Sequence, residues 1–394
     1  MFAKNMVELG QKRSTIREIF EYGKKRAAEI GAENVYDFSI GNPSVPAPDC
    51  VRQAVISVLD TEGPVSAHSY TSAQGDYGVR AAMSEDLNSR FGTHFHADNF
   101  YMTVGAAAAL SCCFKALAEP GDEFIAIAPF FPEYQCFVEK GAGARLVIAE
   151  ADTAAFQINF ERLEAAITPH TKAVIINSPN NPSGAVYSVK TIQTLAALLT
   201  EKSAAFGRPI FLISDEPYRE LVYGGVRVPF ITKYYKNTLV CYSYSKSLSL
   251  PGERIGYVLV PDELEDAKTA YAAICGAGRS LGYVNAPSLF QRVAAACAGQ
   301  TADLAVYEKN RDLLYEGLVS LGFSCVKPEG AFYIFPRSLE PDASAFCLRA
   351  RKYDLLLVPG DDFGCPGHVR ISYCVPTSRI EQALELFKRL AQEY

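Results

Sequence analysis

The sequence predicts an α/β protein with a mainly parallel sheet covered by helices on both faces, followed by a smaller α+β part. Between about residues 50 and 285, short apolar runs alternate with stretches of helical spacing. The runs show little polar alternation, which is typical of strands buried on both faces. Strand followed by helix, repeated along a chain, predicts a doubly wound sheet. Seven strands are expected, over residues 100–104, 123–128, 145–149, 173–177, 210–214, 238–243 and 256–260.

The two ends of the chain have a different pattern. A charged helix is expected over 13–30, and a final helix over 378–391. One long helix is expected over about 286–317, followed by short strands over 323–327, 331–336, 356–358 and 369–374. This pattern indicates a smaller α+β domain. We therefore expect a large domain of residues 46–285, and a second domain that combines residues 1–45 with residues 286–394.

Composition excludes several classes of function. About half of the 394 residues are hydrophobic and the net charge is −6, which argues against a general affinity for nucleic acid or for anionic membranes. The eleven cysteines are scattered and odd in number, so we interpret them as reduced thiols. With five histidines and no clustered ligands, no metal site is expected. Since the N-terminus does not resemble a signal peptide and no stretch reads as a membrane span, the expected location is cytoplasmic.

Polar and aromatic residues follow several of the predicted strands. Gly105, residues 129–131, 177–182, 215–218 and 243–246 each come just after an apolar run. In open α/β sheets, ligands bind at the carboxyl ends of the strands. An aromatic ring, an amide, a carboxylate, a phenol, hydroxyls and a lysine would thus meet at one edge. That set suits a phosphorylated aromatic cofactor.

The segment 243–256 is the most informative in the chain. Lys246 follows a strand and is surrounded by small residues, and a lysine that acts as a nucleophile must be held rigidly with its cationic form disfavoured. The hydroxyls of Ser243 and Ser245, together with Arg254, suit a phosphate group. A lone lysine in such a place is usually an exposed loop residue. Here the surrounding pattern favours a functional lysine.

This segment resembles the lysine-attachment signature of the class I and II aminotransferases, which are fold type I pyridoxal-phosphate enzymes. In that signature a small residue, an apolar or aromatic residue and another small residue precede the lysine, and an arginine follows eight residues later. Further landmarks of the family occur in the same order across essentially the whole chain, at residues 40–43, Tyr70 and Gly75, 177–184, 214–218, 330–333 and 370–373. The aspartate-aminotransferase-like members are the most similar.

The resemblance implies a fold type I PLP-transferase that binds pyridoxal 5′-phosphate (PLP). Lys246 would hold the cofactor as a Schiff base, and Asp215 would pair with its pyridine nitrogen, so that the ring can act as an electron sink. Asn181 and Tyr218 would bond its phenolic oxygen, and Phe131 would stack on the ring. Structural alternatives stay open: a helix cap for the aspartate, turn chemistry for the asparagine and a core position for the phenylalanine.

The resemblance also implies a phosphate site and a second subunit. Gly105, Ala106 and Ala107 open a helix whose free amide groups can bind phosphate. Tyr70 matches a tyrosine that reaches the phosphate of the neighbouring subunit, which implies a homodimer with shared active sites. An ordinary buried tyrosine is the alternative.

For the substrate, the resemblance assigns Arg370 to the α-carboxylate, with Asn181 and the backbone of Gly41 beside it. An arginine inside an apolar strand is costly unless it is paired, which supports this role independently. The implied reaction moves the amino group of an L-amino acid to a 2-oxo acid by a ping-pong mechanism through an aldimine on Lys246. The lysine would carry the proton, and the catalytic set would be completed by Asp215 and Tyr218.

Two other functions compete with transamination. A PLP-dependent carbon–sulfur β-lyase would use the same lysine, aspartate and arginine on the same scaffold. A non-catalytic PLP-binding sensor domain belongs to another class, but such transcription regulators carry an N-terminal helix-turn-helix domain, for which we expect no room.

The identity of the substrate stays open. Some aspartate-type relatives use a lysine for the distal carboxylate where this chain has Ala107. Arg279 lies near the place where relatives present an arginine across the subunit interface, so it is a candidate for reading an acidic side chain. Phe131, Tyr134 and Tyr283 would equally permit an apolar or aromatic substrate.

Overall fold

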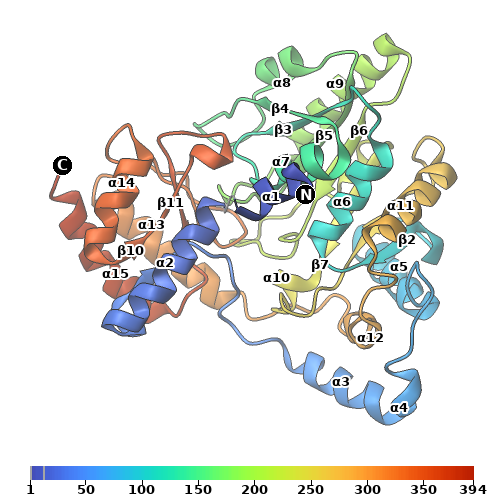
Figure 1. The fold of residues 1–394 in the computed structure, drawn as a ribbon, viewed down its shortest axis with the longest axis horizontal. Helices are drawn as coiled ribbons and strands as arrows, with labels where there is room; N and C mark the ends of the chain where they lie inside the picture. The colour runs from blue at the N-terminus through green and yellow to red at the C-terminus, as the bar shows by residue number, and fades with distance from the viewer. Residues whose placement is uncertain (1, 12–13) are drawn as a thin grey trace.

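The computed structural model describes residues 2–11 and 14–394 (Figure 1). Its helices are α1 (Lys4–Gln11), α2 (Thr15–Ile30), α3 (Asp49–Thr61), α4 (Gly63–Ser66), α5 (Tyr77–Phe91), α6 (Ala106–Leu117), α7 (Glu133–Gln135), α8 (Phe160–Ala166), α9 (Val189–Phe206), α10 (Tyr244–Ser247), α11 (Ala267–Leu281), α12 (Ser288–Ala296), α13 (Ala305–Ser320), α14 (Ala343–Ala350) and α15 (Thr377–Ala391). Its strands are β1 (Tyr36–Asp37), β2 (Phe100–Thr103), β3 (Glu123–Ile127), β4 (Arg145–Ala149), β5 (Thr171–Asn177), β6 (Phe211–Asp215), β7 (Thr238–Ser243), β8 (Gly256–Leu259), β9 (Tyr333–Ile334), β10 (Leu355–Leu356), β11 (Val358–Pro359) and β12 (Val369–Ser372).

The central sheet contains seven strands in the order β2-β8-β7-β6-β5-β3-β4. The seven predicted strands agree with it to within two residues at each end. Strand β8 runs antiparallel to both neighbours, β2 and β7, and the other pairings are parallel. Because two reversals restore the direction, β2 runs the same way as β7. The carboxyl ends of six strands therefore lie at one edge of the sheet, and β8 begins there.

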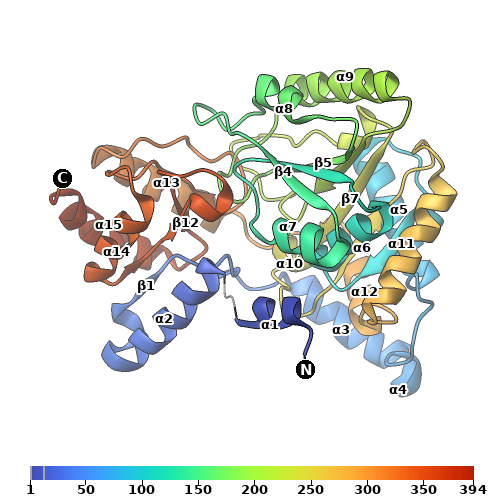
Figure 2. The same cartoon turned by 45° about the horizontal axis from the view of Figure 1, so that its top comes forward.

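Helices cover both faces of this sheet. Successive side chains of a strand point to opposite faces, so Phe124 and Ala126 pack with α6 and α11, whereas Ile125 and Ile127 pack with α8 and α9. Figure 2 shows these two helix pairs on opposite sides of the strands. Helices α3, α5 and α12 pack against the end of the sheet formed by β2, β8 and β7. The doubly wound α/β prediction is thus confirmed.

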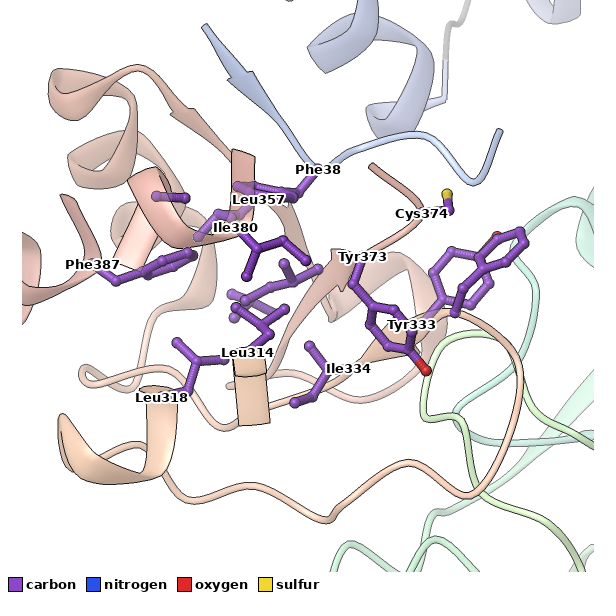
Figure 3. Close-up of a cluster of buried hydrophobic side chains, with 14 of the residues drawn as sticks. Phe38, Leu314, Leu318, Tyr333, Ile334, Leu357, Tyr373, Cys374, Ile380 and Phe387 are labelled. Carbon is purple, nitrogen blue, oxygen red and sulfur yellow. The ribbon is translucent and has the colours of Figure 1, made fainter. Parts of the chain in front are cut away.

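A second core lies in the C-terminal part of the chain (Figure 3). A three-stranded antiparallel sheet, β11-β12-β9, packs with α13, α14 and α15. The N-terminal segment joins this part, because β1 pairs with β10 and Phe38 enters the same core. Figure 1 accordingly shows α2 beside the C-terminal helices. Two segments from opposite ends of the chain therefore fold together.

Some of the expected elements differ in the structure. The predicted strand over 356–358 is divided between β10, which pairs with β1, and β11, which pairs with β12. The predicted long helix over 286–317 is divided into α12 and α13, because Gly299 adopts a φ of 72° that a helix cannot continue through. The predicted strand over 323–327 is absent; instead, the segment receives a backbone hydrogen bond from Arg337 N to Ser324 O. Of the predicted first helix, Arg13 lies outside the described residues. No helix in the described ranges has the length and apolar character needed to cross a membrane.

Candidate active site

Asp215 ends the central strand β6, and its carboxyl group is only partly satisfied. The hydroxyl of Tyr134 donates to Oδ2 at 2.5 Å. The other oxygen, Oδ1, is buried and has no partner among the described residues. A buried acceptor without a partner is costly unless a donor fills the space beside it. The carboxylate therefore fits a ligand that presents an N–H group.

Tyr134 contacts Asp215 and does not line an open substrate site. We interpreted this residue as a possible wall for an aromatic substrate, but its side chain is 1% exposed and its hydroxyl is committed to Asp215. Burial raises its pKa well above the usual value, with the charge of Asp215 adding to the effect. Tyr134 is therefore a neutral donor that orients the carboxylate. Its contact with Asp215 joins residues 81 positions apart, and no local pattern in the sequence signals it.

Burial raises the pKa of Asp215 from 3.8 to about 7, while the hydrogen bond from Tyr134 lowers it and the charge of Glu216 raises it. Because the folded state holds the proton more tightly than the unfolded state, this group's contribution to stability is complete below about pH 4. It is lost as the pH rises through about 7.

We expect the cofactor-free protein to lose roughly 4 kcal/mol of unfolding free energy between about pH 4 and pH 7, as Asp215 gives up its proton. The Asp215→Asn variant should lack this pH-dependent loss of unfolding free energy, which urea unfolding at a series of pH values will measure. If the unfolding free energies of the two proteins depend on pH in the same way, the prediction is wrong.

Lys246 lies in α10, the single helical turn after β7, and its side chain is half-buried. Its Nζ donates a hydrogen bond of 2.6 Å to the carbonyl oxygen of Gly41. Burial lowers its pKa from 10.5 to about 8; Cys374 opposes this shift, and the charges of Arg254 and Arg370 add to it. A larger fraction of the amine is therefore neutral near pH 7 than for an ordinary lysine. Such an amine can act as a nucleophile and as a base.

The N-terminus of α6 and Arg254 form a cradle that suits a phosphate. Gly105 precedes the helix with a φ of 89°, and Ala106 and Ala107 are half-buried in its first turn. No side chain caps this helix N-terminus. A Cβ at Gly105 would come within 2.6 Å of Arg254 Nη2, so only glycine allows the guanidinium to lie here. Free amide groups beside an arginine are a favourable anion site.

Two hydroxyl groups complete the cradle. The Oγ atoms of Ser243 and Ser245 are 2.7 Å apart, and Arg254 Nη1 donates to Ser245 Oγ at 3.4 Å. Ser243 Oγ also accepts from the backbone N–H of Ser245 at 3.1 Å, which caps α10. The three predicted phosphate contacts thus lie together.

Arg370 is held inside β12 without a carboxylate partner among the described residues. It donates through Nη1 to Asn181 Oδ1 at 3.0 Å and through Nη2 to Ser39 O at 2.5 Å, while Nε is buried and unpaired. The rings of Tyr333 and Phe363 lie within 5.0 Å of the guanidinium. Burial lowers its pKa. A buried cation of this kind fits an incoming carboxylate.

The other residues predicted to contact the cofactor or the substrate include Tyr218, Gly41 and Asn181. The hydroxyls of Tyr218 and Tyr333 are 2.9 Å apart, and burial raises the pKa of Tyr218 well above its usual value. A side chain at Gly41 would collide with the hydroxyl of Tyr333, so the backbone there passes close to the site. The side chain of Asn177 fixes Asn181 by accepting from its backbone N–H at 2.7 Å.

Phe131 and Tyr70 occupy different surroundings. Phe131 is half-buried and meets the ring of Tyr134 edge to face at 5.8 Å, beside Asp215. Tyr70 is 84% exposed, so the alternative of an ordinary buried tyrosine is wrong.

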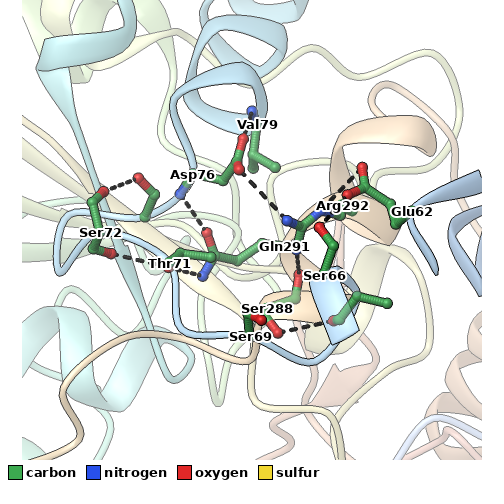
Figure 4. Close-up of polar contacts among 12 residues, drawn as sticks. Glu62, Ser66, Ser69, Thr71, Ser72, Asp76, Val79, Ser288, Gln291 and Arg292 are labelled. Atoms are coloured by element: carbon green, nitrogen blue, oxygen red, sulfur yellow. Dashed lines mark hydrogen bonds and ion pairs between the residues drawn. The ribbon is translucent and has the colours of Figure 1, made fainter. Parts of the chain in front are cut away.

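The segment that carries Tyr70 is nevertheless firmly held (Figure 4). Gln291, fully buried in α12, donates to Thr71 Oγ1 at 3.2 Å and accepts from the N–H of Asp76 at 2.8 Å. Arg292 adds contacts to Asp76 and Glu62. The exposed ring therefore projects from a fixed support.

Two residues considered for substrate choice lie outside this group. Arg279 is exposed in the last turn of α11. Tyr283 is half-buried, and its hydroxyl lies 3.6 Å from Cys112 Sγ.

Residues 33–387 match the family model described as aminotransferase class I and II. The chain belongs to this family. A crystal structure of an aminotransferase from Eubacterium rectale matches it with a TM-score of 0.98 at 60% identity, covering 100% of this chain and 99% of that chain. The aspartate aminotransferase of Thermus thermophilus solved with maleate matches with a TM-score of 0.87 at 28% identity over 99% of each chain. The aspartate/prephenate aminotransferase of Thermus thermophilus is 31% identical over 354 residues, 89% of each protein.

Family membership makes this chain an enzyme of the aminotransferase type. The family and the aspartate-aminotransferase-like fold that the lysine segment indicated are both confirmed.

Proposed function

We propose that this aminotransferase binds PLP covalently through Lys246 and moves the amino group of an L-amino acid to a 2-oxo acid in a ping-pong reaction. The observation that carries the proposal is that three groups of complementary chemistry meet between the carboxyl edge of the central sheet and β12. They are the free carboxylate oxygen of Asp215, the Lys246 amine with its lowered pKa, and the unpaired guanidinium nitrogen of Arg370.

These residues fit PLP. Asp215 Oδ1 would accept from the pyridine nitrogen, and Phe131 would lie against the ring. The cradle of Gly105, Ser245 and Arg254 would take the phosphate. When bound, PLP supplies an electron sink that stabilises charge on the substrate's Cα.

The protein's own groups then have distinct tasks. Arg370 binds the α-carboxylate with Asn181 beside it, which orients the substrate. Lys246 Nζ, which becomes neutral as the pH rises through about 8, takes the proton from the substrate's Cα. Tyr218, whose pKa is raised by burial, stays protonated and donates to the cofactor's phenolic oxygen.

We further propose a homodimer in which Tyr70 contacts the phosphate in the neighbouring subunit. Its support is the 84% exposure of an aromatic ring on a segment fixed by Gln291. The two hydrophobic cores likewise support a large domain of residues 46–285 and a second domain of residues 1–45 with 286–394.

An acidic donor is the first substrate to test. The names of the relatives cited above include aspartate and prephenate, and maleate is a dicarboxylate. Some relatives bind the distal carboxylate of the substrate with a lysine at the position where this chain has Ala107. The exposed Arg279 is therefore the candidate to bind an acidic substrate side chain.

The test is a half-reaction. Single amino acids are added to the PLP-loaded protein without an oxo acid, and the absorption spectrum is followed. Conversion of the cofactor to pyridoxamine phosphate with release of the matching 2-oxo acid is the expected result, and it names the donor. Persistence of the initial spectrum while pyruvate and ammonia accumulate from a β-substituted donor would instead establish the β-lyase.

A further inference from the structure

A line of hydrogen bonds begins at the residue that follows Lys246. Ser247, the residue after Lys246, has its Oγ 2.9 Å from the hydroxyl of Tyr242. That hydroxyl donates to Glu220 Oε2 at 2.7 Å. Glu220 Oε1 accepts from Arg90 Nη2 at 3.0 Å. We call Ser247, Tyr242, Glu220 and Arg90 the relay; the hydrogen bonds that join their side chains involve no residue assigned to cofactor or substrate.

The relay is rigid at its centre. The side chain of Tyr242 is buried, its ring stacks on Tyr257 at 5.0 Å, and the guanidinium of Arg219 lies 4.5 Å over it. Arg219 is in turn fixed by Glu216 at 2.5 Å. A buried polar group with every partner in place has one favoured position. The Tyr242 hydroxyl is therefore a fixed anchor point.

The lysine turn needs such an anchor. Helix α10 has four residues, and a single turn is not stable without outside contacts. Its N-terminus is capped by Ser243 of the phosphate cradle, whose Oγ accepts from the backbone N–H of Ser245. Its last residue, Ser247, is held by the Tyr242 hydroxyl and by a 2.7 Å hydrogen bond from Ala302 N to its carbonyl oxygen. Lys246 lies between these two attachments.

We propose that Glu220, Tyr242 and Ser247 are positioning residues that fix α10 and so place Nζ of Lys246 for proton transfer. The inference rests on the proposed function of Lys246. The lysine side chain has a flexible four-carbon stem, so its reach depends on where the backbone is held. A displacement of about 1 Å can reduce a rate by roughly 100-fold.

The experiment compares Tyr242→Phe, Ser247→Ala and the double variant with a matched control, Tyr244→Phe. Tyr244 is a neighbouring buried tyrosine whose ring meets that of Tyr242 edge to face at 5.0 Å. Its hydroxyl bonds Met83, so Tyr244→Phe keeps the ring packing and removes a hydrogen bond outside the relay. In the PLP-loaded protein we expect each relay variant to lose roughly tenfold in kcat, with KM for the donor nearly unchanged. The double variant should be no worse than Tyr242→Phe, since both changes break one connection.

A spectroscopic readout separates positioning from general stability. The pH at which the bound cofactor's spectrum changes should shift in the same direction in both relay variants and stay at the wild-type value in Tyr244→Phe. Equal behaviour of Tyr242→Phe and Tyr244→Phe in kcat and spectrum would overturn the relay while leaving the proposed function intact. A wild-type protein that forms no lysine-bound cofactor would overturn the proposed function and the inference with it.

Discussion

Lys246→Ala is expected to abolish covalent cofactor attachment and to lower the transamination rate by roughly 10⁴-fold or more, since the general base is removed. Among the described residues, the amine is hydrogen-bonded only to the carbonyl oxygen of Gly41, and burial lowers its pKa to about 8. Removing a cation whose charged form is disfavoured by desolvation relieves that cost, so the variant should fold with a stability equal to or above that of wild type. Borohydride reduction followed by mass measurement of the intact chain reports attachment directly.

The matched control is Lys236→Ala, which changes an exposed lysine in the connection before β7. It should retain the mass increase and the activity of wild type. Covalent attachment that survives in Lys246→Ala would show that another lysine holds the cofactor, and the site assigned at this edge of the sheet would be wrong.

Arg370→Ala is expected to reduce kcat/KM for the amino acid donor by roughly 10³-fold, corresponding to about 4 kcal/mol for a buried carboxylate contact. The guanidinium is fully buried, and its Nε has no partner among the described residues. Most of the loss should appear in KM, for the donor and the oxo acid alike, because both carry the carboxylate. Steady-state kinetics with each substrate varied in turn will measure it.

Arg370→Lys provides the graded comparison. It keeps the charge but cannot meet a carboxylate with two parallel hydrogen bonds, so its loss should lie between those of wild type and alanine. A primary amine that lacks a carboxylate should react equally slowly with wild type and Arg370→Ala. If that amine loses activity to the same extent as the amino acid, Arg370 supports the fold and does not read the substrate.

The sequence predicted the parts of the site that a strand end determines. Asp215, Ser243 and Gly105 follow apolar runs, and a parallel sheet brings such positions to one edge. Tyr134 was misplaced because its contact with Asp215 joins residues 81 positions apart and depends on how the short helix α7 turns. No local pattern specifies that angle.

The C-terminal part was harder to predict for a related reason. Strands β9, β10 and β11 contain two residues each, too few for a periodic signal. The division between α12 and α13 depends on Gly299 and on a contact from Ala302 to Ser247, which is 55 residues away. Long-range contacts of this kind override local helix preference.

The reversed direction of β8 has a consequence for how the chain tolerates insertions. Most groups at the binding edge come from separate strand-to-helix connections, whose lengths can change independently. Lys246 and Arg254, by contrast, share one connection that leaves β7 and returns into β8 at the same edge. One added residue there would move the amine relative to the guanidinium that completes the phosphate cradle. The sheet geometry thus fixes the spacing of eight residues between them. This constraint explains why the short segment 243–256 was enough to indicate the site.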